Sequence, residues 1–322
     1  MGEFELIRRI ALRAARQAMP RAGVVLGIGD DAAVLEVPRG EQLVAAVDTL
    51  VTDVHFPPAT APRDIGWKAL AVNISDFAAM AATPRWALLS MSVNDPAVGA
   101  AIARGALNCA RRFGIALVGG DTTRGPLSVS VTLLGSVARG RALTRSNARA
   151  GEDIWIAGTL GEAAAGLAIA QGRLVVGARE QTRLVRALDR PSPPLGFGIA
   201  LRPIASAAID ISDGVYADLG HVLTASGIGA VIDPARLPAS ATLRRVVPDA
   251  AARERLQSLG DDYTLLFTAQ PRRAARVIDA ATKARIRVTR IGQVAVSRGL
   301  WRTRADGTLA RIPLVGHDHF PP

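Results

Sequence analysis

Short apolar stretches that end in glycine or aspartate recur along this chain, and the repetition limits the folds it can adopt. At one of them, the apolar run 115–118 is followed by two glycines and Asp121, and the alternating stretch 127–133 comes after a polar turn. Glycines after a predicted strand let the backbone turn sharply and approach a ligand closely. Aspartate suits a hard cation, and Arg124 suits a phosphate. Taken alone, the stretch also fits an ordinary turn with a hydrogen-bonded aspartate.

Predicted strands and helices alternate through both halves, which indicates an α/β or α+β protein. In the first half, a predicted strand at 43–47 ends at Asp48, and a long helix begins near Pro62 and ends before Pro84. A chain of 322 residues is longer than one ordinary core, so we expect two domains. The pattern breaks at about residue 145, which gives predicted domains of 1–145 and 146–322.

The composition narrows the class of protein. The formal charge of +11 comes almost entirely from arginine spread along the chain, so we favour a coding bias over a nucleic-acid surface. Cys109 is the only cysteine, which excludes an internal disulfide and a cysteine-based metal site. No apolar run reaches the roughly 18 residues that a membrane helix needs, and no signal peptide is evident. We therefore expect a cytoplasmic protein that binds neither nucleic acid nor a membrane.

Familiar catalytic motifs are missing from the sequence. There is no phosphate-binding loop with lysine and no G-x-S-x-G, and the glycine pair around Ile28 lacks the third glycine of a dinucleotide fold. What remains is a set of aspartates close to predicted strand ends. If these side chains converge, several cations must offset their repulsion. Mg²⁺ with bound phosphates is the natural partner, which points to phosphoryl transfer from a nucleotide. The aspartates are Asp30, Asp48, Asp76, Asp121, Asp210 and Asp213.

In order and spacing, the motifs resemble those of the thiamine-monophosphate kinase family, over nearly the whole chain. This family belongs to a wider group of ATP users that includes aminoimidazole ribonucleotide synthetase. The matching stretches are 2–7, 27–33, 48–51 with 55–56, 67–76, 119–126, 209–214 and 261–263. The resemblance implies ATP-dependent phosphorylation of thiamine monophosphate to thiamine diphosphate. It also implies a two-domain fold whose N-terminal sheet forms a barrel across a homodimer. The first domain would then bind ATP and Mg²⁺, and the second would complete the active site.

The resemblance also assigns roles to single residues. The six aspartates would hold several Mg²⁺ ions, and Asp121, Asp210 and Asp213 among them would be catalytic. Contacts to ATP would come from Gly120, Asp121, Arg145 and Ser212. The pocket for thiamine monophosphate would be lined by His55, Asp261 and Phe320.

Three departures from the family pattern matter. Ala46-Val47 stands where hydroxyl residues usually precede the aspartate, and the shorter Asp261 and the uncharged Thr264 each stand where the family commonly has a glutamate. Three alternatives stay open. One is an enzyme of the same group with another acceptor, and one is a nucleotide-binding module without catalysis, favoured if the Ala46-Val47 change breaks the metal cluster. The third, based on the +11 charge, is a nucleic-acid binder. The selenophosphate branch of the group is disfavoured, because the chain has no N-terminal cysteine.

Overall fold

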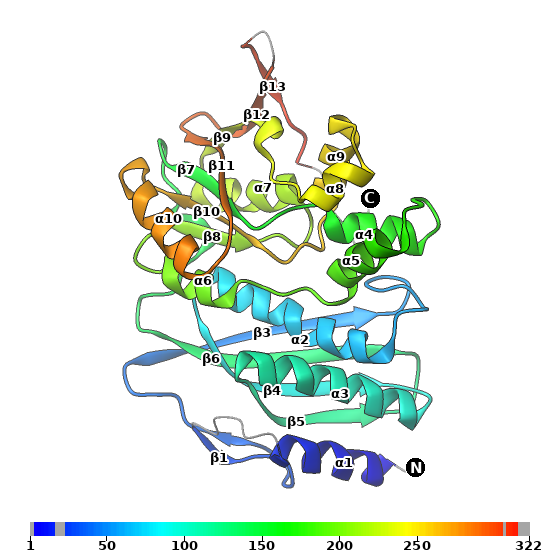
Figure 1. Ribbon diagram of the computed structural model, residues 1–322. Coiled ribbons are helices and arrows are strands. Elements are labelled where there is room, and N and C mark those ends of the chain that lie inside the picture. The colour runs from blue at the N-terminus through cyan, green and yellow to red at the C-terminus, as the bar shows by residue number, and fades with distance from the viewer. Residues whose placement is uncertain (1–2, 17–22, 305–306, 315–322) are drawn as a thin grey trace. The chain divides into compact units, whose positions relative to one another are not determined.

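The computed structural model describes residues 3–16, 23–304 and 307–314. The chain divides into two compact units (Figure 1). The first comprises residues 1–77 and 82–141, and the second comprises residues 78–81 and 142–322.

A four-stranded sheet with the order β3-β6-β4-β5 forms the centre of the first unit. The β3–β6 and β6–β4 pairs are antiparallel, whereas β4 and β5 are parallel. A parallel pair needs a long crossover, and helix α3 supplies it. The strands of the sheet are β3 (Glu41–Val51), β4 (Thr83–Ser92), β5 (Ala116–Thr123) and β6 (Ser128–Ala138). The unit also contains α1 (Glu3–Arg16), β1 (Val24–Leu26), β2 (Val34–Leu35), α2 (Pro62–Ala79) and α3 (Pro96–Phe113).

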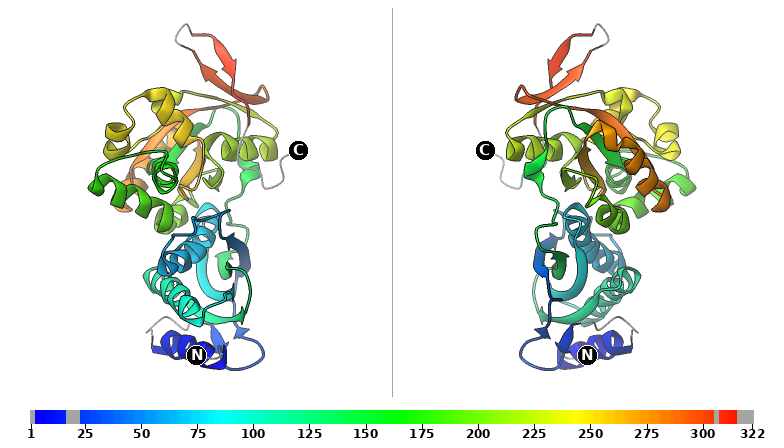
Figure 2. Two further views of the ribbon diagram at one scale, coloured as in Figure 1. Left: turned by 90° about the vertical axis from the view of Figure 1, so that its right-hand side faces the viewer. Right: turned by 90° about the vertical axis from the view of Figure 1, so that its left-hand side faces the viewer.

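Helices α2 and α3 cover one face of this sheet (Figures 1 and 2). The predicted helix between Pro62 and Pro84 is confirmed as α2. Local chemistry fixes both ends of α3: the Asp95 carboxylate accepts from the N–H of Ala97 at 2.7 Å, and Gly114 ends the helix in the left-handed conformation. Along β6, buried Val129, Val131 and Leu133 alternate with partly exposed residues, so only one face of this strand is fully covered.

Strand β3 is longer than the sequence predicts. The predicted strand ended at Asp48, but the ladder with β6 pairs residues 41–51 without interruption. Asp48 therefore lies inside a strand, because the stretch after it continues the β pattern through Thr49, Leu50 and Val51. Asp121 likewise belongs to β5 and does not lie in a turn beyond it.

A seven-stranded sheet with the order β13-β12-β9-β11-β7-β10-β8 organises the second unit. All its pairs are antiparallel except β12 with β9. The strands are β7 (Asp153–Ala157), β8 (Ala207–Asp210), β9 (Gly229–Ile232), β10 (Leu265–Ala269), β11 (Val288–Ala295), β12 (Gly299–Thr303) and β13 (Leu309–Arg311). The helices are α4 (Glu162–Ala170), α5 (Ala178–Asp189), α6 (Leu195–Leu201), α7 (Val215–Ser226), α8 (Ala241–Val246), α9 (Ala250–Gln257) and α10 (Ala274–Lys283).

Both faces of this second sheet are buried at strands β7, β8 and β10. In β7, Ile154 and Ile156 join a core that includes Leu219 of α7. Trp155, which alternates with them, joins a different core that includes Phe197 of α6. Side chains of alternating direction along a strand thus pack against helices on opposite sides. This three-layer arrangement explains why β7 is buried at every position.

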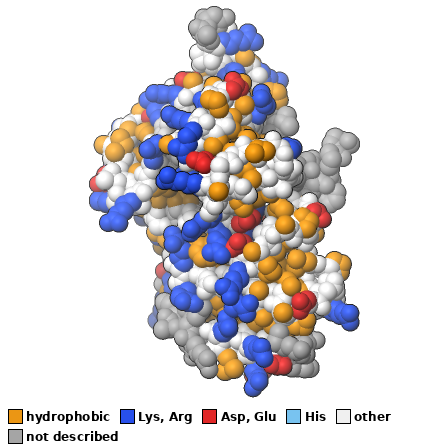
Figure 3. Space-filling model, turned by 45° about the vertical axis from the view of Figure 1, so that its right-hand side comes forward, with side chains coloured by type: hydrophobic (Ala, Val, Ile, Leu, Met, Phe, Trp, Pro, Cys, Tyr) orange, Lys and Arg blue, Asp and Glu red, His pale blue; other side chains and the backbone are white. Residues whose placement is uncertain are grey.

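Two surface features bear on the expectations from composition. None of the helices in the described parts of the chain has the length and apolar character to cross a membrane. On the face drawn in Figure 3, Lys and Arg side chains are scattered among apolar and acidic ones.

Candidate active site

A pocket of about 690 Å³ lies in the first unit, against the sheet. Its walls include Ser90 of β4 and Thr132 of β6, and Ile7 of α1 also lines it. The structure brings three predicted site residues to this pocket: Asp30, Gly120 and Asp121. Asp30 and Asp121 are both exposed, so their carboxylate oxygens are accessible to a ligand.

Close packing of the backbone explains the glycine at position 120. Gly120 pairs with Leu89 of the neighbouring strand and has a φ of 148°, which side chains rarely allow. A Cβ atom at this position would lie 1.9 Å from the carbonyl oxygen of Leu89. Glycine therefore lets β5 lie directly against β4 while the next residue, Asp121, lines the pocket.

The sheet places Asp48 on the opposite face from Asp121. Asp48 pairs with Val131, whose side chain is fully buried, whereas Asp121 pairs with Ser90, which in turn pairs with Ser130. Paired residues share a face, so the two aspartates point to different sides of the sheet. Burial raises the pKa of the Asp48 carboxyl above its ordinary value.

Asp76 lies on α2 among buried neighbours and is itself partly exposed. One turn earlier on the helix, Asn73 is fully buried; its Nδ2 donates to the carbonyl of Ala69. Among the described residues, the Oδ1 atom of Asn73 has no hydrogen-bond partner. A buried acceptor without a donor is uncommon, and an oxygen of this kind suits a cation or a bound water.

His55 lies in the loop after β3, where it is held through both its backbone and its ring. Its Nδ1 accepts from the N–H of Val51 at 3.0 Å, and its carbonyl accepts from Nζ of Lys68 at 3.0 Å. Lys68 is almost completely buried. Because Nδ1 is an acceptor, the neutral ring carries its proton on Nε2.

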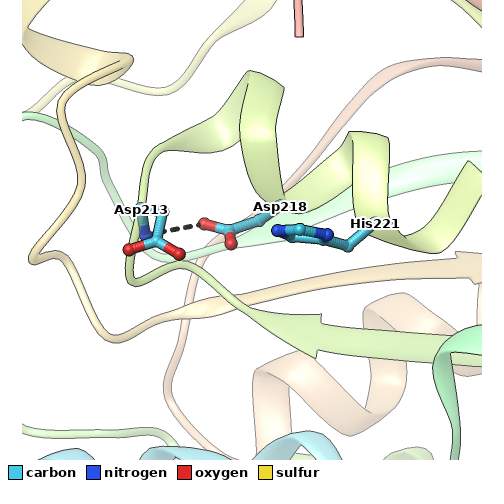
Figure 4. A group of neighbouring side chains, drawn as sticks. All are labelled: Asp213, Asp218 and His221. Atoms are coloured by element: carbon cyan, nitrogen blue, oxygen red, sulfur yellow. Dashed lines mark hydrogen bonds between the residues drawn. The ribbon is translucent and has the colours of Figure 1, made fainter. Parts of the chain in front are cut away.

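In the second unit, Asp210 ends strand β8, and the turn 211–214 leads into α7. The carboxylates of Asp213 and Asp218 and the ring of His221 have ligand atoms within 4.8 Å of one another (Figure 4). The N–H of Asp213 donates to Oδ2 of Asp218. Burial, together with the charges of Asp210 and Asp213, raises the pKa of Asp218 to about 8.

Residues 260–263 form a turn with unusual backbone angles. Gly260, Asp261 and Tyr263 have positive φ values of 86°, 63° and 46°. Such angles are uncommon outside glycine and concentrate at functional sites. Within this turn, the Asp262 carboxylate accepts from the N–H of Gly161, with oxygens at 2.8 and 3.0 Å, at the start of α4. Burial raises the pKa of Asp262 well above its ordinary value.

Arg145 begins a short 3-10 helix and is exposed; its carbonyl accepts from Oγ of Ser226 at 2.9 Å. Ser212 lies in the turn before α7, and its carbonyl accepts from the N–H of Asp261 at 2.8 Å. Thus Ser212 and Asp261, one predicted for ATP and one for thiamine monophosphate, lie in adjoining backbone segments. Phe320 lies outside the described residues.

The predicted metal ligands are distributed over both units. Asp30, Asp48, Asp76 and Asp121 belong to the first, and Asp210 and Asp213 to the second. Within the described ranges, the one group of three possible ligands is Asp213 with Asp218 and His221. A joint site for the six aspartates stays a prediction. Their carboxylates, with the free Oδ1 of Asn73, are the hard oxygen donors that fit Mg²⁺.

Asp218 and His221 were not predicted as site residues. The sequence signal is their spacing of three residues on the helix that follows Asp213 and a glycine, which places both side chains on one helical face. The sequence also carries no sign that Asp262 reaches a helix start about a hundred residues away.

Family models identify the class of protein. The model "AIR synthase related protein, N-terminal domain" matches residues 29–137, and the corresponding C-terminal domain model matches residues 149–300. An E. coli HypE structure aligns with a TM-score of 0.78 at 22% identity, which shows the shared fold. The chain is therefore a two-domain α/β protein of the AIR synthase related class.

More similar proteins narrow the class to one family. The thiamine-monophosphate kinase of Escherichia coli K12 is 43% identical over 324 residues, covering 99% of this chain and 98% of that protein. The Bacillus subtilis kinase is 32% identical, covering 99% and 100%. The crystal structure of the Stenotrophomonas maltophilia kinase matches with a TM-score of 0.86 and 43% identity, covering 96% and 98%. The chain belongs to the thiamine-monophosphate kinase family, which confirms the resemblance.

Proposed function

We propose that this chain transfers the γ-phosphoryl group of ATP to the phosphate of thiamine monophosphate, giving thiamine diphosphate and ADP. One observation carries the proposal beyond the family relationship: Asp30, Gly120 and Asp121 line one pocket, although ninety residues separate the first from the others. A structure described as AaThiL complexed with AMPPCP and TMP is 28% identical, with a TM-score of 0.78, and covers 99% of this chain. That relative therefore forms a complex with both AMPPCP and TMP.

In this proposal, a phosphate oxygen of thiamine monophosphate attacks the γ-phosphorus of ATP in line with the bond to the leaving group. A new P–O bond forms as the bond between the γ-phosphorus and the oxygen that bridges it to the β-phosphate breaks, and that oxygen leaves with ADP. The attacking phosphate is already anionic, so no strong base is needed. Catalysis then depends on positioning and on neutralising charge.

The chain's own residues have distinct tasks. Gly120 lines the pocket, and its backbone is a proposed contact of ATP. Arg145 is a matching cation for ATP, with Ser212 as a further polar contact. Asp121, Asp210 and Asp213, with Asp30, Asp48 and Asp76, are the proposed holders of Mg²⁺. When bound, Mg²⁺ supplies positive charge that offsets the phosphates. His55, Asp261 and Phe320 are the proposed contacts of thiamine monophosphate.

We also propose that two copies of the first unit pair through their sheets in a homodimer. Strand β3 is an edge strand of 11 residues. Leu43, Val47 and Val51 on one side of it are 57%, 64% and 37% exposed. A long apolar edge usually needs a partner, which supports the barrel across a dimer. In the proposed organisation, residues 1–145 bind ATP and Mg²⁺ and dimerise, residues 146–322 complete the active site, and the enzyme works in the cytoplasm.

A test of acceptor choice separates this function from its alternatives. The purified chain is incubated with ATP and Mg²⁺ and with thiamine, thiamine monophosphate or no acceptor, and ADP and thiamine products are measured by chromatography. Thiamine diphosphate should form only from thiamine monophosphate, in step with ADP. ATP consumption with neither thiamine compound as acceptor would point to another substrate, and ATP binding without any turnover would indicate a binding module.

A further inference from the structure

The turn 211–214 is confined by the segment 258–261. The N–H of Asp261 donates to the carbonyl of Ser212 at 2.8 Å. Gly214 has a φ of 111°, and a Cβ atom there would lie 2.0 Å from the carbonyl oxygen of Ser258. Backbone packing thus limits the turn on this side.

Helix α7 holds the same turn through one side chain, Asp218. Only 2% of Asp218 is exposed, and its Oδ2 accepts from the N–H groups of both Asp213 and Gly214, at 3.1 Å each. In Figure 4 the dashed contact runs from Asp218 to the backbone nitrogen of Asp213 and not to its carboxylate. The N-cap residue of α7 is Gly214, which has no side chain to bind these donors. Asp218 therefore satisfies N–H groups that are otherwise costly to bury.

We infer that Asp218 is a positioning residue: it holds the backbone of Asp213 and Gly214 so that the Asp213 carboxylate is turned toward the metal and substrate side. This inference rests on the proposed function, in which Asp213 binds Mg²⁺. When a hydrogen-bond acceptor that orients a metal-binding residue is removed, the affinity for the metal typically falls about 10–100-fold. The number of ions bound should not change, because Asp218 contributes its oxygen to N–H groups.

The opposing assignment is that Asp218 is itself a metal ligand, together with His221. The two side chains and Asp213 are close enough for that. The two assignments differ for Asp218→Asn, because an amide oxygen can still accept N–H bonds but supplies no negative charge to a cation. They also differ for His221→Ala, which removes a possible ligand and leaves both backbone bonds to Asp218 intact.

The experiment uses the full chain and three variants: Asp218→Asn, Asp218→Ala and His221→Ala. Mn²⁺, a paramagnetic substitute for Mg²⁺, is titrated while free ion is followed by electron paramagnetic resonance, which gives both number and affinity of sites. In parallel, hydrogen exchange of the metal-free proteins is measured on peptides that cover residues 209–217. The exchange measurement reports the two backbone bonds without requiring metal or turnover.

If Asp218 is a positioning residue, Asp218→Asn binds the wild-type number of Mn²⁺ ions with an affinity within about threefold of the wild-type value. The same result is expected for His221→Ala. Asp218→Ala keeps the number of ions but loses about 10–100-fold in affinity, and exchange in the 209–217 peptides rises about tenfold or more. Loss of a whole ion in Asp218→Asn or His221→Ala would overturn the inference. So would wild-type affinity and exchange in Asp218→Ala. If Asp218→Ala does not fold, Asp218→Asn and His221→Ala still decide between the roles.

Failure of the proposed function gives a different result. If the wild-type chain binds no Mn²⁺, the metal assignment of Asp213 falls. Hydrogen exchange then decides whether Asp218 holds the turn: unchanged protection in Asp218→Asn with lost protection in Asp218→Ala supports the role, and equal protection in all forms contradicts it.

Discussion

Replacing Gly120 by alanine tests whether close packing between two strands shapes the pocket. The added Cβ atom would lie 1.9 Å from the oxygen of Leu89, 2.6 Å from its carbonyl carbon and 2.9 Å from its nitrogen. Because all three are backbone atoms, β5 must move away from β4. Overpacking of this kind costs about 1–3 kcal/mol, and a side chain at a φ of 148° adds about 1–3 kcal/mol. We expect Gly120→Ala to lower the free energy of unfolding by about 2–6 kcal/mol.

Gly29→Ala is the matched control in the same pocket. Gly29 also has a positive φ, of 130°, but an added Cβ atom meets no heavy atom within 4 Å. Only the backbone cost of about 1–3 kcal/mol applies there. Urea unfolding of both variants, followed by circular dichroism, should place Gly120→Ala about 1–3 kcal/mol below Gly29→Ala. Equal loss of stability in the two variants would refute the packing argument, and ATP binding by Gly120→Ala at wild-type affinity would refute the pocket assignment.

Three further predictions concern single side chains. Cys109 is fully buried, and burial raises the pKa of its thiol. A thiol reagent should therefore label the chain only after unfolding. Rapid labelling of the native protein would contradict the burial of Cys109. Folded Asp262 keeps its proton to a higher pH than unfolded Asp262, so the melting temperature of the wild type should fall relative to that of Asp262→Asn as pH rises from about 4. Parallel plots of melting temperature against pH for the two proteins would contradict the pKa shift. Asp121→Asn should abolish turnover with an unchanged circular dichroism spectrum, and a variant with the wild-type rate would remove Asp121 from the metal site.

Local sequence signals predicted the secondary structure well where end signals were clear. Pro62 marks the real start of α2, and the helix ends before Pro84 as predicted. Asp48 shows the limit of such reasoning: an aspartate after an apolar run looks like a strand end, but pairing with β6 continues for three residues beyond it. Long-range pairing of this kind overrides local preference, since it depends on a partner more than eighty residues away.

The candidate site was only partly predictable for a similar reason. Gly120 and Asp121 stand out because glycine beside aspartate is a local pattern, and the structure places both in a pocket. Asp218 and Asp262 do not stand out, because their roles depend on backbone N–H groups whose positions the tertiary fold determines. A carboxylate that binds backbone donors looks in sequence like any other aspartate on a helix or in a turn.

Phosphorus NMR of the purified chain with ATP, Mg²⁺ and thiamine monophosphate tests the proposed reaction most directly, because it follows donor, acceptor and products in one sample. We predict that the thiamine monophosphate signal declines while the two signals of thiamine diphosphate grow, with one ADP formed for each thiamine diphosphate. Release of inorganic phosphate with an unchanged thiamine monophosphate signal would contradict transfer to this acceptor.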